Sequence, residues 1–122
     1  QVLKAARAFM ARGTVVVTSA ELADTPDGEI ETLAVERANA WRVRTPKLPI
    51  SPHGTGDLFA ALLVAKRISG ADTPDALAHA ASAIFAVLER TAISGTEEMR
   101  IVESAEWLTH PQRQFECIAV GP

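Results

Sequence analysis

Apolar residues recur along the first half of the chain with spacings that alternate between helix and strand. A helical spacing covers 2–12, and the β-branched run Thr14–Thr18 predicts a strand buried on both faces. After a polar loop, two further strands are expected at Glu31–Arg37 and Ala40–Thr45, with Asn39 in the turn between them. The pattern therefore predicts a helix, a buried strand and a hairpin.

The second half begins with a proline-rich extended connector at 46–52. Two amphipathic helices are predicted next, at Leu58–Ile68 and from Thr73 to about Thr91. A strand at Met99–Val102 and a short helix at Glu103–Leu108 are expected to follow. Thr73 is expected to be the N-cap of the second of these helices. This order indicates a layered α/β sheet. Three strands before Gly54 are few for a sheet with helices on both faces, so we expect partner strands elsewhere.

Composition and charge limit the classes of function. The 122 residues carry a net charge of −3, with 48% apolar and 22% charged residues, which fits one small globular domain. The chain is slightly acidic, and its one basic cluster is short: Arg42, Arg44 and Lys47. No nucleic-acid partner is therefore predicted. No apolar run approaches the roughly 18–20 residues that a membrane span needs, so no membrane partner is predicted. The single Cys117 fits a reducing compartment, and a cytoplasmic location is expected. The chain opens at Gln1 within a helical pattern, so we expect it to be part of a longer protein.

Histidine and cysteine positions give no support for a metal centre. His53, His79 and His110 share no metal-ligand spacing, and Cys117 has no neighbouring base. We therefore predict no metal ligands and no cysteine nucleophile in this chain. His53 is either a plain loop histidine or a phosphate contact.

The segment that carries chemistry is 53–61, HGTGDLFAA. It lacks the Lys-Ser/Thr ending of a P-loop, and Phe59 stands where a dinucleotide-binding turn has its third glycine. What remains is a Gly-x-Gly turn that opens directly into a helix. The glycines allow a sharp turn close to a ligand, and the first helical amides around Thr55–Leu58 form an anion site suited to phosphate.

Asp57 lies in the first turn of this helix. A carboxylate beside a phosphate makes sense if it accepts the proton of a hydroxyl that attacks the phosphorus while the amides stabilise the transferring group. The alternative is an ordinary loop-to-helix turn, in which Asp57 only stabilises the helix, by about 0.3–1 kcal/mol. The residue types alone leave both interpretations open.

The string HGTGDLFAALL resembles the C-terminal signature of the ribokinase-like kinases, and specifically of the pyridoxal kinases. The strand TVVVTS, the hairpin, the proline-rich connector and the two helices also follow one another as in that family. The resemblance covers most of 1–92. It implies that residues 1–122 form the C-terminal part of a three-layer α/β/α sandwich whose N-terminal half lies outside this chain.

The resemblance also implies roles for individual residues. Asp57 takes the position of the catalytic base, in contact with the substrate hydroxyl, and Gly54, Thr55 and Gly56 take that of the anion hole. Contacts with ATP are implied for Thr18, Ser19, Thr45, Pro46, Lys47, Leu48 and His53.

The implied reaction is ATP-dependent phosphorylation of the 5′-hydroxymethyl group of pyridoxal and related B6 vitamers, with Mg²⁺, in a homodimeric enzyme of vitamin B6 salvage. Sugar kinases of the superfamily carry GAGD after Asp-Thr, whereas this chain has Ser51-Pro52-His53 and Thr55, which disfavours a sugar. Hydroxymethylpyrimidine kinase is the alternative, but those enzymes carry Cys at the position of Asp57. A non-catalytic nucleotide-binding fragment is the other alternative, and we expect this segment alone to be inactive.

Overall fold

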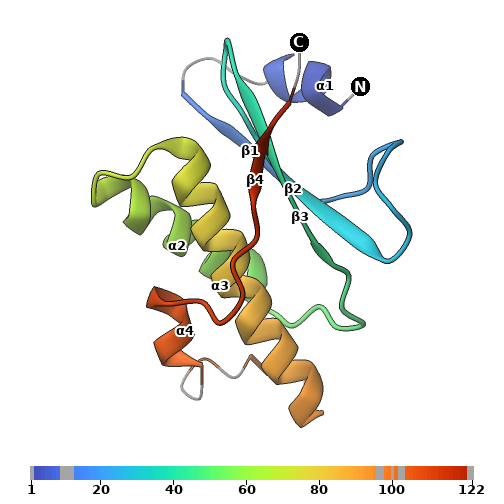
Figure 1. The fold of residues 1–122 in the computed structure, drawn as a ribbon, viewed down its shortest axis with the longest axis vertical. Coiled ribbons are helices and arrows are strands. Elements are labelled where there is room, and N and C mark those ends of the chain that lie inside the picture. The colour runs from blue at the N-terminus through green and yellow to red at the C-terminus, as the bar shows by residue number, and fades with distance from the viewer. Residues whose placement is uncertain (1, 9–12, 96–97, 100, 102–103, 121–122) are drawn as a thin grey trace.

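The computed structural model shows a four-stranded sheet with helices packed on both faces (Figure 1). It describes residues 2–8, 13–95, 98–99, 101 and 104–120. The elements are α1 (Val2–Ala8), β1 (Val15–Ala20), β2 (Glu29–Val35), β3 (Ala40–Pro46), α2 (Thr55–Ile68), α3 (Thr73–Ser94), α4 (Ala105–Thr109) and β4 (Cys117–Ala119). The α/β class predicted from the sequence is confirmed.

The strands are antiparallel throughout and lie in the order β1-β2-β3-β4. β2 and β3 pair without interruption, and the Glu36 N–H donates to the Asn39 carbonyl at 2.8 Å in the turn between them. This confirms the predicted hairpin around Asn39.

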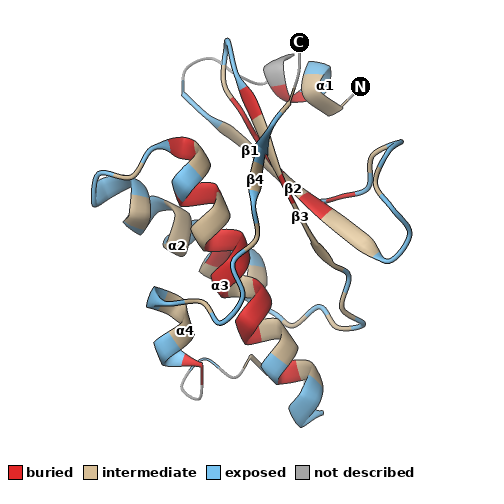
Figure 2. Ribbon diagram, viewed as in Figure 1, coloured by how far each residue is buried: buried red, intermediate tan, exposed pale blue. Residues whose placement is uncertain are grey.

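Successive residues of β2 pack on opposite faces of the sheet. Ala34 packs with Phe59 of α2 and Leu77 of α3, whereas Val35 packs with Ala6 of α1. Side chains on a strand alternate between faces, so adjacent apolar residues can contribute to two separate clusters. Figure 2 shows the buried residues concentrated on α3 and the middle of the sheet, so the core lies between these elements.

The start of α3 differs by one residue from the prediction. The N-cap is Asp72, whose carboxylate accepts the Asp75 N–H at 3.0 Å. Thr73, predicted as the cap, is buried and donates its hydroxyl to Glu36 at 2.7 Å. A tertiary contact thus takes the hydroxyl that the sequence pattern assigned to capping. The helix continues to Ser94, a few residues past the expected end.

The prediction that the first strand is buried on both faces is wrong. Its three valines, 15–17, are half-buried, and Thr18 and Ser19 are exposed. β1 is an edge strand that pairs only with β2 among the described strands. A continuous β-branched run gives the same sequence signal whether a strand has one neighbour or two, so it could not settle this point.

The C-terminal region also departs from the pattern. Met99 and Ile101 are not in a strand, and the other residues of the strand predicted there lie outside the described residues. The helix expected at Glu103–Leu108 is α4, with Glu103 also outside the described residues. The fourth strand, β4, pairs Cys117 with Val43 of β3. Three residues are too few to display an alternation, which explains why the sequence pattern missed it. At the N-terminus, α1 confirms 2–8 of the helix expected over 2–12, and 9–12 lie outside the described residues.

Among the described residues, α3 is the one helix that is long and apolar enough to cross a membrane by length and composition. The sequence pattern predicts no such segment. However, 56% of its apolar window is buried inside the protein, as in the core helix of a folded domain. The length of α3 therefore reflects its position in the core.

Candidate functional site

A pocket of about 420 Å³ lies where β1, β2 and β3 face the start of α2 and the second half of α3. Its lining residues come from segments far apart in the sequence: Thr18, Ser19, Ile30, Thr32, Thr45, Ser51, Pro52, His53, Gly54, Thr55, Gly56, Phe59, Ile84 and Leu88. The polar residues come largely from strand ends and the connector, and the apolar residues largely from helices. This combination suits a ligand with one charged and one apolar part.

The glycine turn at the start of α2 needs its glycine at position 54. Gly54 has φ +84°, and a Cβ there would lie 3.3 Å from the Met99 Cε. The Leu58 N–H donates to the Gly54 carbonyl at 2.9 Å, which is the first helical hydrogen bond. The amides of 55–57 precede this bond and have no acceptor within the helix, so together with the helix dipole they form an anion site.

The hydroxyl of Thr55 fixes the same turn from the inside. It donates to the Pro52 carbonyl at 2.7 Å, and its oxygen lies 3.8 Å from the Met99 sulfur. Because this hydroxyl is already used, the group that Thr55 can offer an anion is its backbone N–H. The segment after α3 thus supports the turn through Met99.

The opposite wall carries an unusual backbone conformation. Ser19 has φ +55°, the one positive φ at a non-glycine among the residues that the structure describes. It lies where the pairing of β1 with β2 shifts register between Val17 and Ala20. A bulge of this kind re-aims side chains at the end of a strand, and strained residues often occur at functional sites. Here it brings Thr18 and Ser19 into the pocket lining.

The loop that follows β1 is held by charged side chains. Glu31 is completely buried on β2, accepts the Thr25 hydroxyl, and lies 3.4 Å from the Arg42 Nε and 3.3 Å from the Arg44 Nε. Arg42 also donates two hydrogen bonds to Asp24, and this bonding holds the pKa of Asp24 below its usual value. The arginines of the basic cluster therefore pair with acids of the protein itself.

The structure brings together most of the residues predicted for nucleotide contacts. The pocket is lined by seven of them: Thr18, Ser19, Thr45, His53, Gly54, Thr55 and Gly56. Pro46, Lys47 and Leu48 are not among its lining residues. Lys47 instead lies 3.3 Å from Glu21, and its N–H donates to the Gly28 carbonyl at 2.8 Å, so it braces the loop after β1.

Asp57 lies one residue beyond the pocket lining. It is exposed on the first turn of α2, directly after Gly56. A side chain in that position is accessible to a molecule that approaches from outside the pocket, which suits a base acting at the boundary between two bound reactants.

The family resemblance implies that the wall of the adenine site continues into the helix expected at Thr73 to about Thr91, but the sequence did not identify the residues of that wall. Ile84 and Leu88 of α3 lie opposite Ile30 of β2 and Phe59 of α2. Ile84 and Leu88 belong to the helical stripe that the spacing predicts, but spacing alone does not separate core residues from pocket residues. The spacing thus predicts that both residues lie on an apolar face of the helix, but it does not show that this face borders a pocket.

The described residues contain no group of three or more His, Cys, Asp or Glu side chains that could hold a metal ion. A magnesium ion that entered with nucleotide phosphates would need few protein ligands. The described side chains form no metal cage of their own.

Comparison with known proteins gives a consistent result. No protein-family model matches the chain. Two curated relatives are the pyridoxal kinases PdxY of Leifsonia xyli, 43% identical over 98% of this chain, and of Corynebacterium diphtheriae, 41% identical over 92%. The chain is related in sequence to the pyridoxal kinases. It spans about two fifths of the length of these relatives, 42% and 40%.

Solved structures of pyridoxal kinases share the fold. The Leishmania donovani enzyme in complex with ADP and pyridoxine matches with a TM-score of 0.76 at 25% identity, over 88% of this chain and 39% of its own. A structure from Bacteroides thetaiotaomicron that carries the name putative phosphomethylpyrimidine kinase matches with a TM-score of 0.74 at 23% identity, over 88% of this chain and 38% of its own. At that identity the second match shows the fold alone. The chain is thus an α/β segment of ribokinase-like fold.

Proposed function

We propose that this chain is the C-terminal portion of an ATP-dependent kinase that phosphorylates the 5′-hydroxymethyl group of pyridoxal and related B6 vitamers. One observation carries the proposal. The Gly54–Gly56 turn, with its unpaired helical amides, lines the same pocket as Thr18, Ser19 and Thr45 from the sheet. The relatedness to pyridoxal kinases supports this substrate.

In this proposal the amides of Thr55 and Gly56 bind the phosphoryl group that is transferred. Backbone N–H groups are fixed before the reaction begins, so they stabilise the charge on the migrating group without reorganising. Thr18 and Ser19, on the facing strand end, contact the remaining phosphates. Ile84 and Leu88 supply an apolar wall for the adenine ring, and Thr45 and His53 border the nucleotide, with 46–48 further from it.

Asp57 acts as the base. The oxygen of the substrate alcohol forms a bond to the γ-phosphorus, the bond from that phosphorus to the bridging oxygen breaks, and ADP leaves. The alcohol proton passes to the Asp57 carboxylate. Because Asp57 is exposed directly beyond the lining, it is accessible to an alcohol that binds next to the terminal phosphate.

The setting of the reaction belongs to the same proposal. Mg²⁺ bound to the ATP phosphates would neutralise part of their charge, and it would need few ligands from the protein. The intact enzyme is a cytoplasmic homodimer of vitamin B6 salvage, and the remainder of its chain supplies most of the pyridoxal pocket. The segment alone is then inactive, because it lacks that pocket.

Two alternatives receive less support. A hydroxymethylpyrimidine kinase shares the fold, but the curated relatives reported above are pyridoxal kinases, and position 57 carries Asp. A non-catalytic remnant would not need a carboxylate directly after the anion-binding turn.

The nucleotide part of the proposal is tested by adding ADP and AMP to the ¹⁵N-labelled protein. ADP is expected to shift the amide signals of Thr18 and Ser19 and to bind more tightly than AMP, because its second phosphate contacts that strand end. The amide signals of Thr55 and Gly56 are expected to shift when a non-hydrolysable ATP analogue supplies the third phosphate. Equal binding of ADP and AMP, or signal changes confined to other regions, would overturn the assignment of this pocket.

A further inference from the structure

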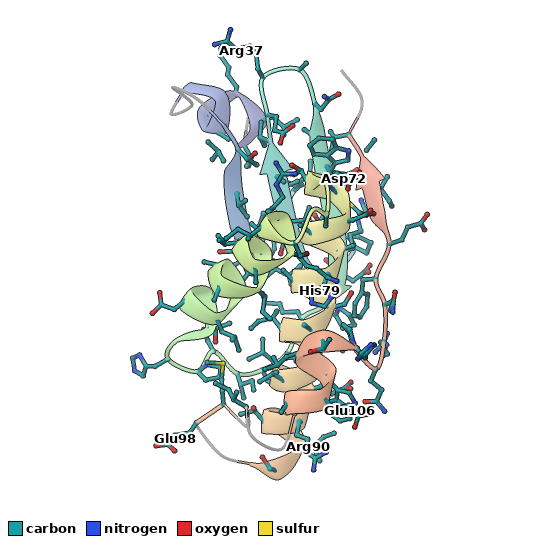
Figure 3. The ribbon with its side chains drawn as sticks, turned by 90° about the vertical axis from the view of Figure 1, so that its left-hand side faces the viewer. Arg37, Asp72, His79, Arg90, Glu98 and Glu106 are labelled. Carbon is teal, nitrogen blue, oxygen red and sulfur yellow. The ribbon has the colours of Figure 1, made fainter. Side chains whose placement is uncertain are left out.

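The first half of α3 lines a second pocket, of about 390 Å³, which shares no residue with the nucleotide pocket. It lies between the C-terminal end of α2, the loop that leads into α3, and the segment 109–115. Figure 3 labels His79 on α3, between Asp72 at the start of that helix and Glu106 of α4. Nothing in the proposed kinase reaction uses this pocket.

Three basic side chains converge on this second pocket from different elements. Lys66 comes from α2, His79 from α3, and His110 directly follows α4. Asp75 is the one carboxylate among the lining residues that the structure describes. Burial lowers the pKa of His79, and the positive charge of Lys66 and, more weakly, that of His110 lower it further.

His79 has a defined orientation. A hydrogen bond between its ring and the backbone of Leu108 favours the protonated ring and so opposes the lowering of its pKa. One ring nitrogen is thereby occupied as a donor. The other nitrogen is an acceptor when the ring is neutral and becomes a second donor only when the ring is protonated.

The outer wall of the pocket is fixed to α3. The hydroxyl of Ser82, which is 2% exposed, accepts the Phe115 N–H at 2.9 Å. The Phe115 ring packs edge-on against Phe85 at 5.0 Å between centroids. The segment that carries His110 and Gln114 is therefore anchored at both ends, by α4 and by Phe115.

We propose that this second pocket binds a small oxyanion of the phosphate or sulfate class through Lys66, His79 and His110. The charges of Lys66 and Asp75 cancel, so a neutral His79 leaves an anion without the attraction of an added charge. Protonation of His79 adds a positive charge to the lining and gives the ring a second donor. Binding of the anion is therefore expected to strengthen as the pH falls through the titration of His79.

The test follows the ring protons of His79 and His110 by NMR in sodium sulfate and in sodium chloride of equal ionic strength. Sulfate is chosen because it keeps its double negative charge across the pH range, so any pH dependence comes from the protein. Sulfate is expected to raise the pKa of His79 by about one pH unit relative to chloride, because an anion nearby favours the protonated ring. Equal titration curves in the two salts would overturn the proposal without any variant.

Two variants of identical charge change give the control. Lys66→Gln removes a pocket cation and is expected to weaken sulfate binding near pH 6 about fivefold. Lys4→Gln removes a cation from α1 on the other face of the sheet and is expected to leave the binding unchanged. An equal loss in both variants would indicate general electrostatic attraction and contradict the site. Inorganic phosphate and phosphate monoesters, added afterwards, distinguish the possible natural sources of the anion.

Discussion

The turn at Gly54 combines two constraints that act on a single residue. Its backbone has a left-handed conformation, and Met99 occupies the space beside it. The neighbouring Gly56 has neither constraint: its φ is not positive and no atom lies within 4 Å of an added Cβ. Two glycines that look equivalent in the sequence therefore have different roles.

Gly54→Ala is expected to lower the free energy of unfolding by about 1–2 kcal/mol, because an L-residue is strained in this conformation. Urea unfolding measures the change. Gly56→Ala is the matched control and should be neutral or slightly stabilising, since alanine favours helix and meets no neighbour. Equal destabilisation by both changes would show that the left-handed turn is not what requires Gly54.

The environment of Cys117 predicts how its reactivity depends on pH. Burial, with smaller contributions from Asp75 and Asp72, raises the pKa of its thiol to about 11. Alkylation by iodoacetamide should therefore keep accelerating, about tenfold per pH unit, through pH 9 without a plateau. The unfolded chain loses this proton at a lower pH than the folded one, so the contribution of Cys117 to stability falls as the pH rises above about 9. A rate plateau near the ordinary thiol pKa would contradict this environment.

At the scale of single residues, local chemistry was predictable and its surroundings were not. The Gly-x-Gly turn that opens a helix could be identified at 54–56 because its determinants are adjacent in the sequence. The bulge that turns Ser19 into the pocket depends on strand pairing, and the apolar wall at Ile84 and Leu88 depends on how α3 lies across the sheet. Neither arrangement is encoded within a short window.

Among the elements, the long periodic ones were predicted best. The hairpin, α2 and α3 have enough residues to display their period, whereas the three-residue β4 does not. The cap of α3 shows a different limit, because two neighbouring residues, Asp72 and Thr73, could both cap. Only the tertiary contact between Thr73 and Glu36 decides between them.

Asp72→Ala is expected to cost about 1 kcal/mol of stability, because the Asp75 N–H loses its side-chain acceptor. Asp72→Asn is the control and should lose little, since asparagine caps about as well. Thermal unfolding followed by circular dichroism compares the two variants with the parent protein. A loss of the same size for Asn and Ala would show that the charge matters and not the cap.

At the scale of the whole molecule, the proposed reaction requires the start of α2 to lie between the nucleotide and the alcohol substrate. The sheet ends and α3 form a pocket on one side of the glycine turn, and Asp57 is exposed immediately beyond it. The turn itself lies between the two sides. The chain covers about two fifths of its curated relatives, so the remaining walls around Asp57 belong to the part of the enzyme that we propose lies outside this segment.

The central claim is that the Asp57 carboxylate removes the proton of the substrate alcohol. The direct measurement is kcat for pyridoxal phosphorylation by the full-length kinase carrying Asp57→Asn, with ADP affinity measured alongside and Asp27→Asn, in an exposed loop, as control. The account predicts that kcat falls by about 10²–10⁴-fold in Asp57→Asn while ADP binding and the control stay near the parent values. A kcat close to that of the parent enzyme would contradict it.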